Sequence, residues 1–156
     1  MIDIEIPGST NLHISHLVLD YNGTLALDGE LLEGVAERME RLLPHLQMHV
    51  ITADTHGTVN MKLNGLPCSL HIIGPREQDR QKDAYVRSLG AENVVAIGNG
   101  RNDSLMLKTA ALGFALIQEE GGSVAGILQA DIVCTDILNA FDLLLNPSRL
   151  KATLRN

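Results

Sequence analysis

The chain of 156 residues is long enough to bury one sizeable hydrophobic core and short for two domains of ordinary size, so we expect residues 1–156 to form a single domain. Its formal charge of −7 would repel a nucleic-acid backbone, and no run reaches the ~20 apolar residues that a membrane helix needs. Because the start MIDIEIPG also lacks the pattern of a signal peptide, we expect a cytoplasmic protein that binds neither nucleic acid nor a membrane.

The first predicted elements are strands. Alternating segments IDIEI and LHISH flank a PGST turn, which predicts a small antiparallel hairpin. Six short apolar runs rich in Val and Ile follow, bounded by Gly and polar residues, and this pattern predicts buried strands. The runs are LVLD ending at Asp20, MHVIT ending at Thr52, SLHIIG ending at Gly74, NVVAIGN ending at Asn99, FALI at 114–117 and DIVC at 131–134.

Helical segments are expected between these strands, because apolar residues recur there at spacings of three and four. The expected helices are 33–43, 57–63, 76–89, 103–110, 123–130 and 136–145, with Pro44, Gly90 and Pro147 as stop signals. Alternating strands and helices predict parallel strands joined by right-handed crossovers. The fold class is therefore α/β, a doubly wound, Rossmann-like parallel sheet with helices on both faces.

Chemically useful residues stand at the ends of three predicted strands. Asp20, Thr52 and Asn99 end their runs, and ligands of open parallel sheets bind beyond the carboxyl ends of the strands. Lys82 lies near the start of a predicted helix, where its side chain could reach the same edge, and the loop GNGRND ends in Asp103. This set of carboxylate, hydroxyl, ammonium and amide groups suits a phosphoryl group with a magnesium ion.

Four segments resemble the motifs of the haloacid dehalogenase-like hydrolases: DYNGTL, the strand ending at Thr52, Lys82, and GNGRNDSLML. ITADTHGTVNMKLNGLP, GNGRND and GSVAGILQADIVCTD are also similar to the phosphorylation domain of P-type ATPases, and the resemblance covers roughly residues 12–140 in order. Without membrane helices, the likeness is to soluble P-type ATPase-like members. Too few residues separate Asp20 from Thr52, and Thr52 from Lys82, to hold a cap domain, so we expect an open site.

The resemblance implies that Asp20 is the nucleophile, which forms an aspartyl phosphate while its other oxygen holds magnesium. Gly23 has no side chain and would let the backbone approach the phosphate closely. Thr24 would supply a hydroxyl group, and Leu25 would anchor a flap. The alternative for Asp20 is a strand-end aspartate that caps a turn, because asparagine followed by glycine is an ordinary turn pair.

Asn22 departs from the family pattern. By analogy its backbone carbonyl would bind magnesium, but phosphatases of this family usually carry aspartate here as the general acid and base. An amide cannot transfer protons in this way, and its presence costs on the order of 100 to 10,000-fold with poor leaving groups. P-type ATPases have threonine at this place and a long-lived aspartyl phosphate, so the asparagine is expected to slow dephosphorylation.

Thr52 would donate a hydrogen bond to a phosphate oxygen, with Ala53 beside it in the phosphate site, although a β-branched residue also suits a strand end. Lys82 would neutralise charge on the phosphoryl group and the nucleophile. The alternative is a lysine on a solvated helix face, and Arg76 and Arg80 compete for the role. We choose Lys82 because it aligns with the lysine of the family.

The loop GNGRND has Asn99 where the family expects an acid. An amide oxygen can still bind magnesium, although more weakly than a carboxylate does. Asp103 would bind the ion directly or through water, and it could also cap the following helix. Asp54 is expected to support its loop by hydrogen bonding. With Asn22 and Asn99 in place of acids, we predict weak metal binding.

The main hypothesis is a magnesium-dependent phosphohydrolase that acts through phospho-Asp20 on a phosphorylated small molecule or a phosphoprotein, slowly on alkyl phosphates. The alternative is a catalytically weak or inactive protein of the same fold that binds phosphate or a partner and has a regulatory role. A phospho-receiver domain is disfavoured, because it would carry its phosphorylated aspartate after the third strand. The open site and the apolar tail FDLLLNPSRL make a homodimer plausible.

Overall fold

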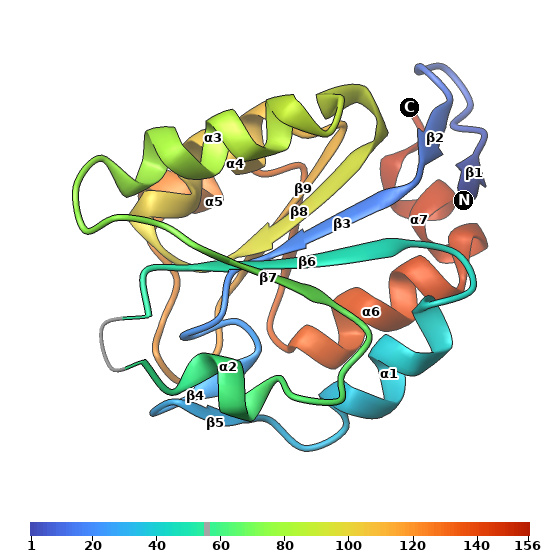
Figure 1. Ribbon diagram of the computed structural model, residues 1–156. Helices are drawn as coiled ribbons and strands as arrows, with labels where there is room; N and C mark the ends of the chain where they lie inside the picture. The colour runs from blue at the N-terminus through green and yellow to red at the C-terminus, as the bar shows by residue number, and fades with distance from the viewer. Residues whose placement is uncertain (55–56) are drawn as a thin grey trace.

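A six-stranded parallel sheet runs through the centre of the protein. The computed structural model describes residues 1–54 and 57–156 and has the strand order β10-β9-β8-β3-β6-β7 (Figure 1). The strands are β3 (His16–Leu19), β6 (Gln47–Thr52), β7 (Ser69–Ile72), β8 (Val94–Gly98), β9 (Leu112–Leu116) and β10 (Ile132–Cys134). From β3 the chain adds β6 and then β7 on one side of β3, and it then adds β8, β9 and β10 on the other side. Strand order thus reverses between β3 and β8, which is where ligands of such sheets bind.

Helices cover both faces of the sheet, as the alternating pattern predicted (Figure 1). One face carries α1 (Val35–Leu42), α6 (Ile137–Leu145) and α7 (Pro147–Leu154), and the other carries α3 (Gln78–Ser88), α4 (Ser104–Thr109) and α5 (Val124–Ile127). Short 3-10 turns are η1 (Ala91–Asn93) and η2 (Arg101–Asp103). Within β3, Leu17 and Leu19 pack into one core and Val18 into the other, because successive side chains point to opposite faces.

Two small hairpins lie outside the central sheet. The first pairs β1 (Ile2–Ile4) with β2 (Leu12–Ile14) in antiparallel register, which confirms the predicted N-terminal hairpin; β1 packs against α7. The second pairs β4 (Ala26–Leu27) with β5 (Glu30–Leu31) and follows Asp20 directly as a flap. Helix α2 (Val59–Lys62) lies beside this flap, and Lys62 forms an ion pair with Glu30.

The described part of the chain holds no cap domain. Between β3 and β6 it forms only the flap and α1, and between β6 and β7 only α2, with Thr55 and His56 of the segment ITADTHG outside the described residues. Within residues 1–54 and 57–156, every helix falls short of the length and apolar character that a membrane crossing requires.

Three sequence predictions need correction. The strand predicted to be buried around Leu70 is β7, an edge strand that leaves half of the surface of Ile72 exposed, because only β6 pairs with it. Strand β9 begins at Leu112 and not at 114, since Gly113 fits within the strand where a Cβ atom would collide with the backbone of α4. Pro147 is predicted only as a stop. It also starts α7, because a residue in the first turn of a helix needs no N–H partner.

Candidate active site

A cleft of about 320 Å³ opens at the carboxyl ends of β3, β6 and β8, next to the point where strand order reverses. Five residues that the sequence analysis proposed for the site line this cleft: Asp20, Asn22, Thr52, Ala53 and Asn99. The other lining residues are Asp54, Gln78, Gly100 and Asn102. The structure therefore brings together, in one depression, residues that are far apart in the sequence.

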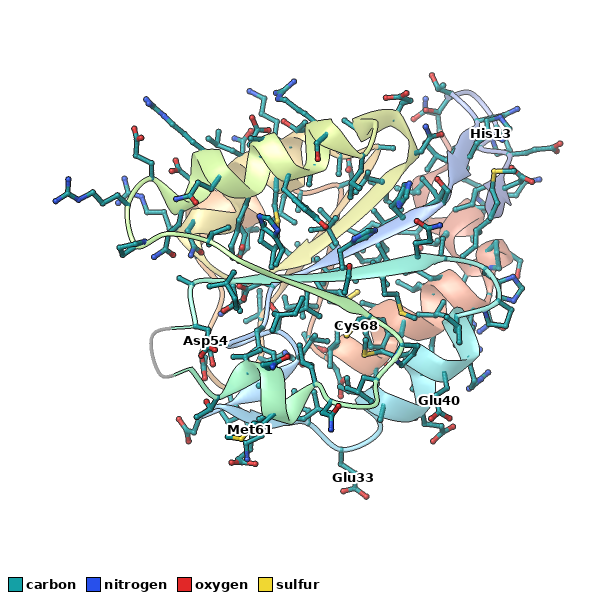
Figure 2. The ribbon with its side chains drawn as sticks, viewed as in Figure 1. His13, Glu33, Glu40, Asp54, Met61 and Cys68 are labelled. Carbon is teal, nitrogen blue, oxygen red and sulfur yellow. The ribbon has the colours of Figure 1, made fainter. Side chains whose placement is uncertain are left out.

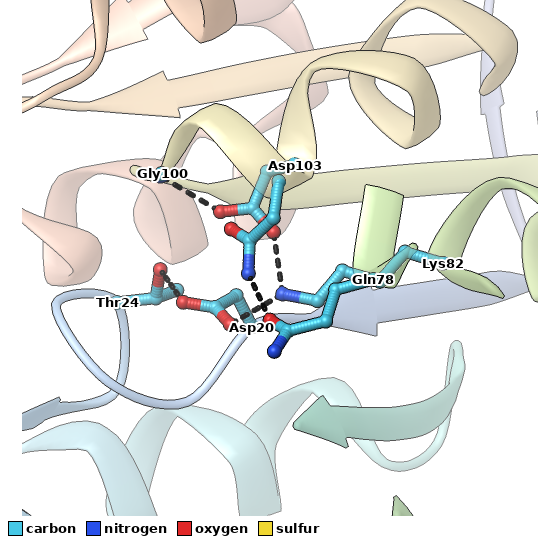
Figure 3. Close-up of polar contacts among 7 residues, drawn as sticks. Asp20, Thr24, Gln78, Lys82, Gly100 and Asp103 are labelled. Atoms are coloured by element: carbon cyan, nitrogen blue, oxygen red, sulfur yellow. Dashed lines mark hydrogen bonds and ion pairs between the residues drawn. The ribbon is translucent and has the colours of Figure 1, made fainter. Parts of the chain in front are cut away.

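Lys82 lies behind the cleft between two carboxylates (Figure 3). Its Nζ donates a hydrogen bond of 2.6 Å to Asp20 Oδ1 and another of 2.6 Å to Asp103 Oδ1. The side chains of Lys82 and Asp103 are 1% and 0% exposed, whereas that of Asp20 is 10% exposed. Asp20 is thus the member of this triad that faces the cleft, and Lys82 fixes its orientation.

The buried triad holds two negative charges against one positive charge, and this shifts the pKa values. Burial alone would lower the pKa of Lys82, but the charges of Asp20 and Asp103 outweigh it and raise that pKa above its ordinary value. Burial, followed by repulsion from Asp20, raises the pKa of Asp103 to about 6, although Lys82 and the N–H group of Gly100 act in the opposite direction. Lys82 therefore stays charged throughout the physiological pH range.

Removing the ammonium group should be costly for the fold. We expect Lys82→Met to lower the free energy of unfolding by about 3–5 kcal/mol, because two buried carboxylates lose their shared partner. Lys62→Met is the matched control, since Lys62 also contacts a carboxylate at 2.6 Å but on the surface, where such a pair contributes less than about 1 kcal/mol. Denaturant unfolding at neutral pH measures both, and equal losses in the two variants would contradict this assignment.

The pKa of Asp103 should depend on the negative charge of Asp20 beside it. Because its pKa in the folded protein, about 6, lies above its ordinary value, this group stabilises the fold at low pH, and the contribution is lost as pH rises through about 6. Asp20→Asn removes one source of repulsion, so we expect a lower Asp103 pKa in that variant. An NMR titration of the Asp103 carboxyl carbon in the metal-free protein tests this, and an unchanged pKa would argue against the coupling.

The loop after β3 shapes the rim of the site. Thr24 is fully buried and its Oγ1 donates to Asp20 Oδ2 at 3.2 Å. Gly23 has a φ of 78°, and a Cβ atom there would collide with the side chain of Asn99. Gly23 does not line this cleft; it lines a second cavity of about 540 Å³, together with Gln118 and Ile137. Asp20 is absent from that cavity, so the smaller cleft is the candidate active site.

Gln118, just beyond β9, holds this loop in place. Its Nε2 donates to the backbone oxygens of Gly23 and Thr24 at 3.1 and 3.0 Å, and its Oε1 accepts from the N–H group of Ile137 at 2.8 Å. One amide side chain thus joins the loop after Asp20 to the start of α6. No motif pointed to Gln118, because its partners are backbone groups that only the fold brings near.

The proposed metal ligands converge in part. Asp20, Asn22 and Asn99 line the cleft, so one carboxylate and neutral oxygens are available, and no group of three or more His, Cys, Asp or Glu residues arranged for a metal occurs within the described residues. Magnesium binds through one or two carboxylates together with water and substrate phosphate oxygens. The residues present fit a weakly held magnesium ion.

Asp103 has a different environment from these residues. Its Oδ1 accepts from Lys82, and its Oδ2 accepts from the N–H group of Gly100 at 2.8 Å. The side chain fits here because Gly98 has no Cβ atom, which would collide with it. Asp103 is placed to hold Lys82, and its role as a metal ligand stays a prediction.

The end of β6 supplies the opposite wall. Thr52 is the last residue of the strand and is buried, and Ala53 and Asp54 follow it along the cleft. Asp54 lies at the start of the loop between β6 and α2 (Figure 2), and its carboxylate accepts from the N–H groups of Thr58 and Val59. These hydrogen bonds confirm the prediction that Asp54 supports its loop.

Two amide side chains at the cleft were not assigned from the sequence. Asn102 Nδ2 donates to Gln78 Oε1 at 2.8 Å, which joins η2 to the first residue of α3, and both residues line the cleft. Asn102 belongs to the loop GNGRND, so the motif could have indicated that it lies at the site, whereas no sequence motif pointed to Gln78.

Comparisons with known proteins find two uncharacterized relatives in sequence, both from Methanocaldococcus jannaschii. No protein-family model matches the chain. The chain is similar to the uncharacterized protein MJ0073 of Methanocaldococcus jannaschii, with 54% identity over 65 residues, which are 42% of this chain and 70% of that protein.

Solved structures share the fold at low sequence identity. A cobalt-bound deoxy-D-mannose-octulosonate 8-phosphate phosphatase from Haemophilus influenzae has a TM-score of 0.72 at 14% identity, over 90% of this chain and 92% of that one. The corresponding Moraxella catarrhalis enzyme, in complex with magnesium, phosphate and a KDO molecule, has a TM-score of 0.64 at 17% identity, over 90% and 93%. A zinc-transporting PIB-type ATPase has a TM-score of 0.60 at 17% identity, over 78% of this chain and 20% of that one.

Proposed function

The chain belongs to the family of the uncharacterized protein MJ0073 and has a haloacid dehalogenase-like fold, and from this premise we propose that it is a phosphohydrolase acting through Asp20. The observation that carries the proposal is the position of Asp20. Its carboxylate faces the cleft while Lys82 holds one oxygen and Thr24 the other. A nucleophile held in this way is ready for attack without further reorganisation.

The proposed reaction has two displacements at phosphorus. A carboxylate oxygen of Asp20 forms a bond to phosphorus while the bond to the leaving oxygen breaks, which gives an aspartyl phosphate. Water then attacks the same phosphorus atom, releases phosphate and restores the carboxylate. Lys82 balances negative charge on Asp20 and the phosphoryl group, and Thr52 at the opposite wall donates a hydrogen bond to a phosphoryl oxygen.

Magnesium is the proposed cofactor. Asp20, the backbone carbonyl of Asn22 and the amide oxygen of Asn99 would hold it, and when bound it would offset the charge of the phosphoryl group. The magnesium-bound enzyme of the same fold supports this choice. Since Asp20 is the one carboxylate among these ligands, we expect half-saturation only at high magnesium concentrations.

The leaving group must be a good one. Asn22 lies exposed at the cleft where a general acid would be needed, and its amide cannot protonate a departing alkoxide. Acyl phosphates leave without such help, so they are the proposed donors. The two amides at positions 22 and 99 also favour a second candidate, a regulator that binds phosphate and turns over slowly or not at all.

Initial rates on three donors separate these candidates. We expect acetyl phosphate and an aryl phosphate to be hydrolysed faster than a sugar phosphate, with activity lost on chelation of magnesium and restored by its return. Hydrolysis of the sugar phosphate at an equal rate would contradict the proposed preference. Binding of phosphate without turnover of any donor would favour the regulator.

A further inference from the structure

We propose that this cleft selects phosphoryl donors whose leaving group carries no negative charge of its own. The inference rests on the proposed function and adds the substrate class to it. The phosphoryl group must lie against Asp20, and the leaving group must extend into the cleft because the rest of Asp20 is buried. The charges that line the cleft therefore act on the leaving group.

The described residues that line the cleft carry only negative charge. Asp20 and Asp54 are acidic, and no lysine, arginine or histidine occurs among the described lining residues. The remaining side chains are amides, a hydroxyl group and small residues. A carboxylate or a second phosphate on the leaving group would find no cation among the described residues of this wall.

Lys82 does not compensate for this deficit. It is fully buried, does not line the cleft, and is already outnumbered by Asp20 and Asp103, with which it forms ion pairs of 2.6 Å. The positive charge of a bound magnesium ion would be offset by the negative charge of the phosphoryl group itself. The region around the phosphorus atom thus stays negative overall, as the whole chain does at −7.

Nearby arginines lie outside the cleft. Arg80 is exposed on α3 and pairs with Glu77 at 2.8 Å, and Arg76 and Arg101 are exposed residues that do not line the cleft. Their charges act through solvent, where screening limits their reach to about 8–10 Å. The carboxylates of Asp20 and Asp54, by contrast, line the cleft itself.

The neutral pair Gln78–Asn102 lies where a substrate would meet this wall. Asn102 Nδ2 donates to Gln78 Oε1, and Gln78 Nε2 donates to the backbone oxygen of Pro75 at 3.4 Å. This leaves the Asn102 oxygen and the second N–H of the Gln78 amide to contact a ligand. These groups can bind hydroxyl or amide groups, which need no opposite charge. Gln78 is exposed enough to be substituted, so it can be used to change the charge of the wall.

The test compares two aryl phosphates of equal size, 4-carbamoylphenyl phosphate and 4-carboxyphenyl phosphate, with magnesium present. We expect kcat/KM to be about five- to tenfold higher for the neutral compound. An effect of this size is what repulsion between one added charge and a nearby carboxylate produces close to a protein surface. Gln78→Lys should reduce this ratio by a similar factor, and so should high salt, because both weaken the repulsion.

Two control variants separate charge from other effects. Gln78→Met loses the hydrogen bond to Asn102 without adding charge, so it should keep the wild-type ratio. Gln47→Lys adds the same charge at the start of β6, the end of the strand opposite to Thr52, and should also keep it. Comparing ratios between variants cancels the intrinsic difference between the two leaving groups.

Each outcome decides the proposal. A ratio that falls only in Gln78→Lys and at high salt supports selection by charge. Equal rates on both compounds in the wild type, or a ratio that Gln78→Lys leaves unchanged, would overturn the selection while the phosphohydrolase assignment stands. If neither compound nor acetyl phosphate is hydrolysed, both proposals are wrong.

Discussion

Replacing Asp20 with asparagine is expected to lower the turnover of acetyl phosphate by at least about 1,000-fold, because an amide cannot attack phosphorus to form an acyl phosphate. The side chain keeps nearly the same shape, and its oxygen can still accept from Lys82. The loss should therefore appear in kcat, as initial rates at saturating magnesium and substrate will show.

The fold should survive this substitution. Asp20→Asn removes one of two carboxylates that share a single ammonium group, so repulsion within the buried triad falls. Asp79→Asn, on the first turn of α3, is the control with the same change of charge outside the cleft. Activity lost equally in both variants, or kept in Asp20→Asn, would rule out Asp20 as the nucleophile.

Replacing Asn22 with aspartate is expected to raise the hydrolysis of an alkyl phosphate by on the order of 100 to 10,000-fold, the contribution of a positioned general acid and base. Asn22 is exposed at the cleft, so the new carboxyl group has access to solvent protons. The gain for acetyl phosphate should be much smaller, because its leaving group departs without protonation. Rates on the two donors, with and without the substitution, measure the difference.

Asn99→Asp is the matched control for this gain. It places the same carboxylate elsewhere in the cleft, beside Gly23, where it would strengthen magnesium binding rather than transfer protons. We expect it to lower the magnesium concentration needed for half-saturation and to affect both donors alike. If Asn22→Asp also accelerated both donors by the same factor, the missing acid would not be the reason for slow turnover of alkyl phosphates.

The sequence predicted the inner strands of the sheet well because β3, β6, β8 and β9 are buried on both faces. Runs such as the one ending at Asp20 are continuously apolar, a pattern that parallel strands produce and few other elements share. The reversal of strand order then places Asp20 and Asn99 at one edge, so their proximity follows from topology. The choice of Lys82 over Arg76 and Arg80 came from the family resemblance and not from the local pattern.

Other features depend on contacts that no local pattern records. A lysine in a polar helix resembles a solvated residue, yet Lys82 is buried because two carboxylates far away in the sequence meet it there. Gln118 contacts backbone atoms almost a hundred residues away. The exposure of Ile72 in β7 follows from its place at the edge of the sheet, which the apolar run does not reveal.

The residue to which phosphorus becomes covalently attached decides whether Asp20 is the nucleophile. The protein is incubated with acetyl phosphate and magnesium, quenched in acid and digested, and its peptides are examined by mass spectrometry. The proposed mechanism requires one phosphorylated peptide, with the phosphoryl group on Asp20. This peptide should be absent from Asp20→Asn and from samples treated with a chelator, and it should be longer-lived in the wild type than in Asn22→Asp. A phosphoryl group on another residue, or its persistence in Asp20→Asn, would contradict this mechanism.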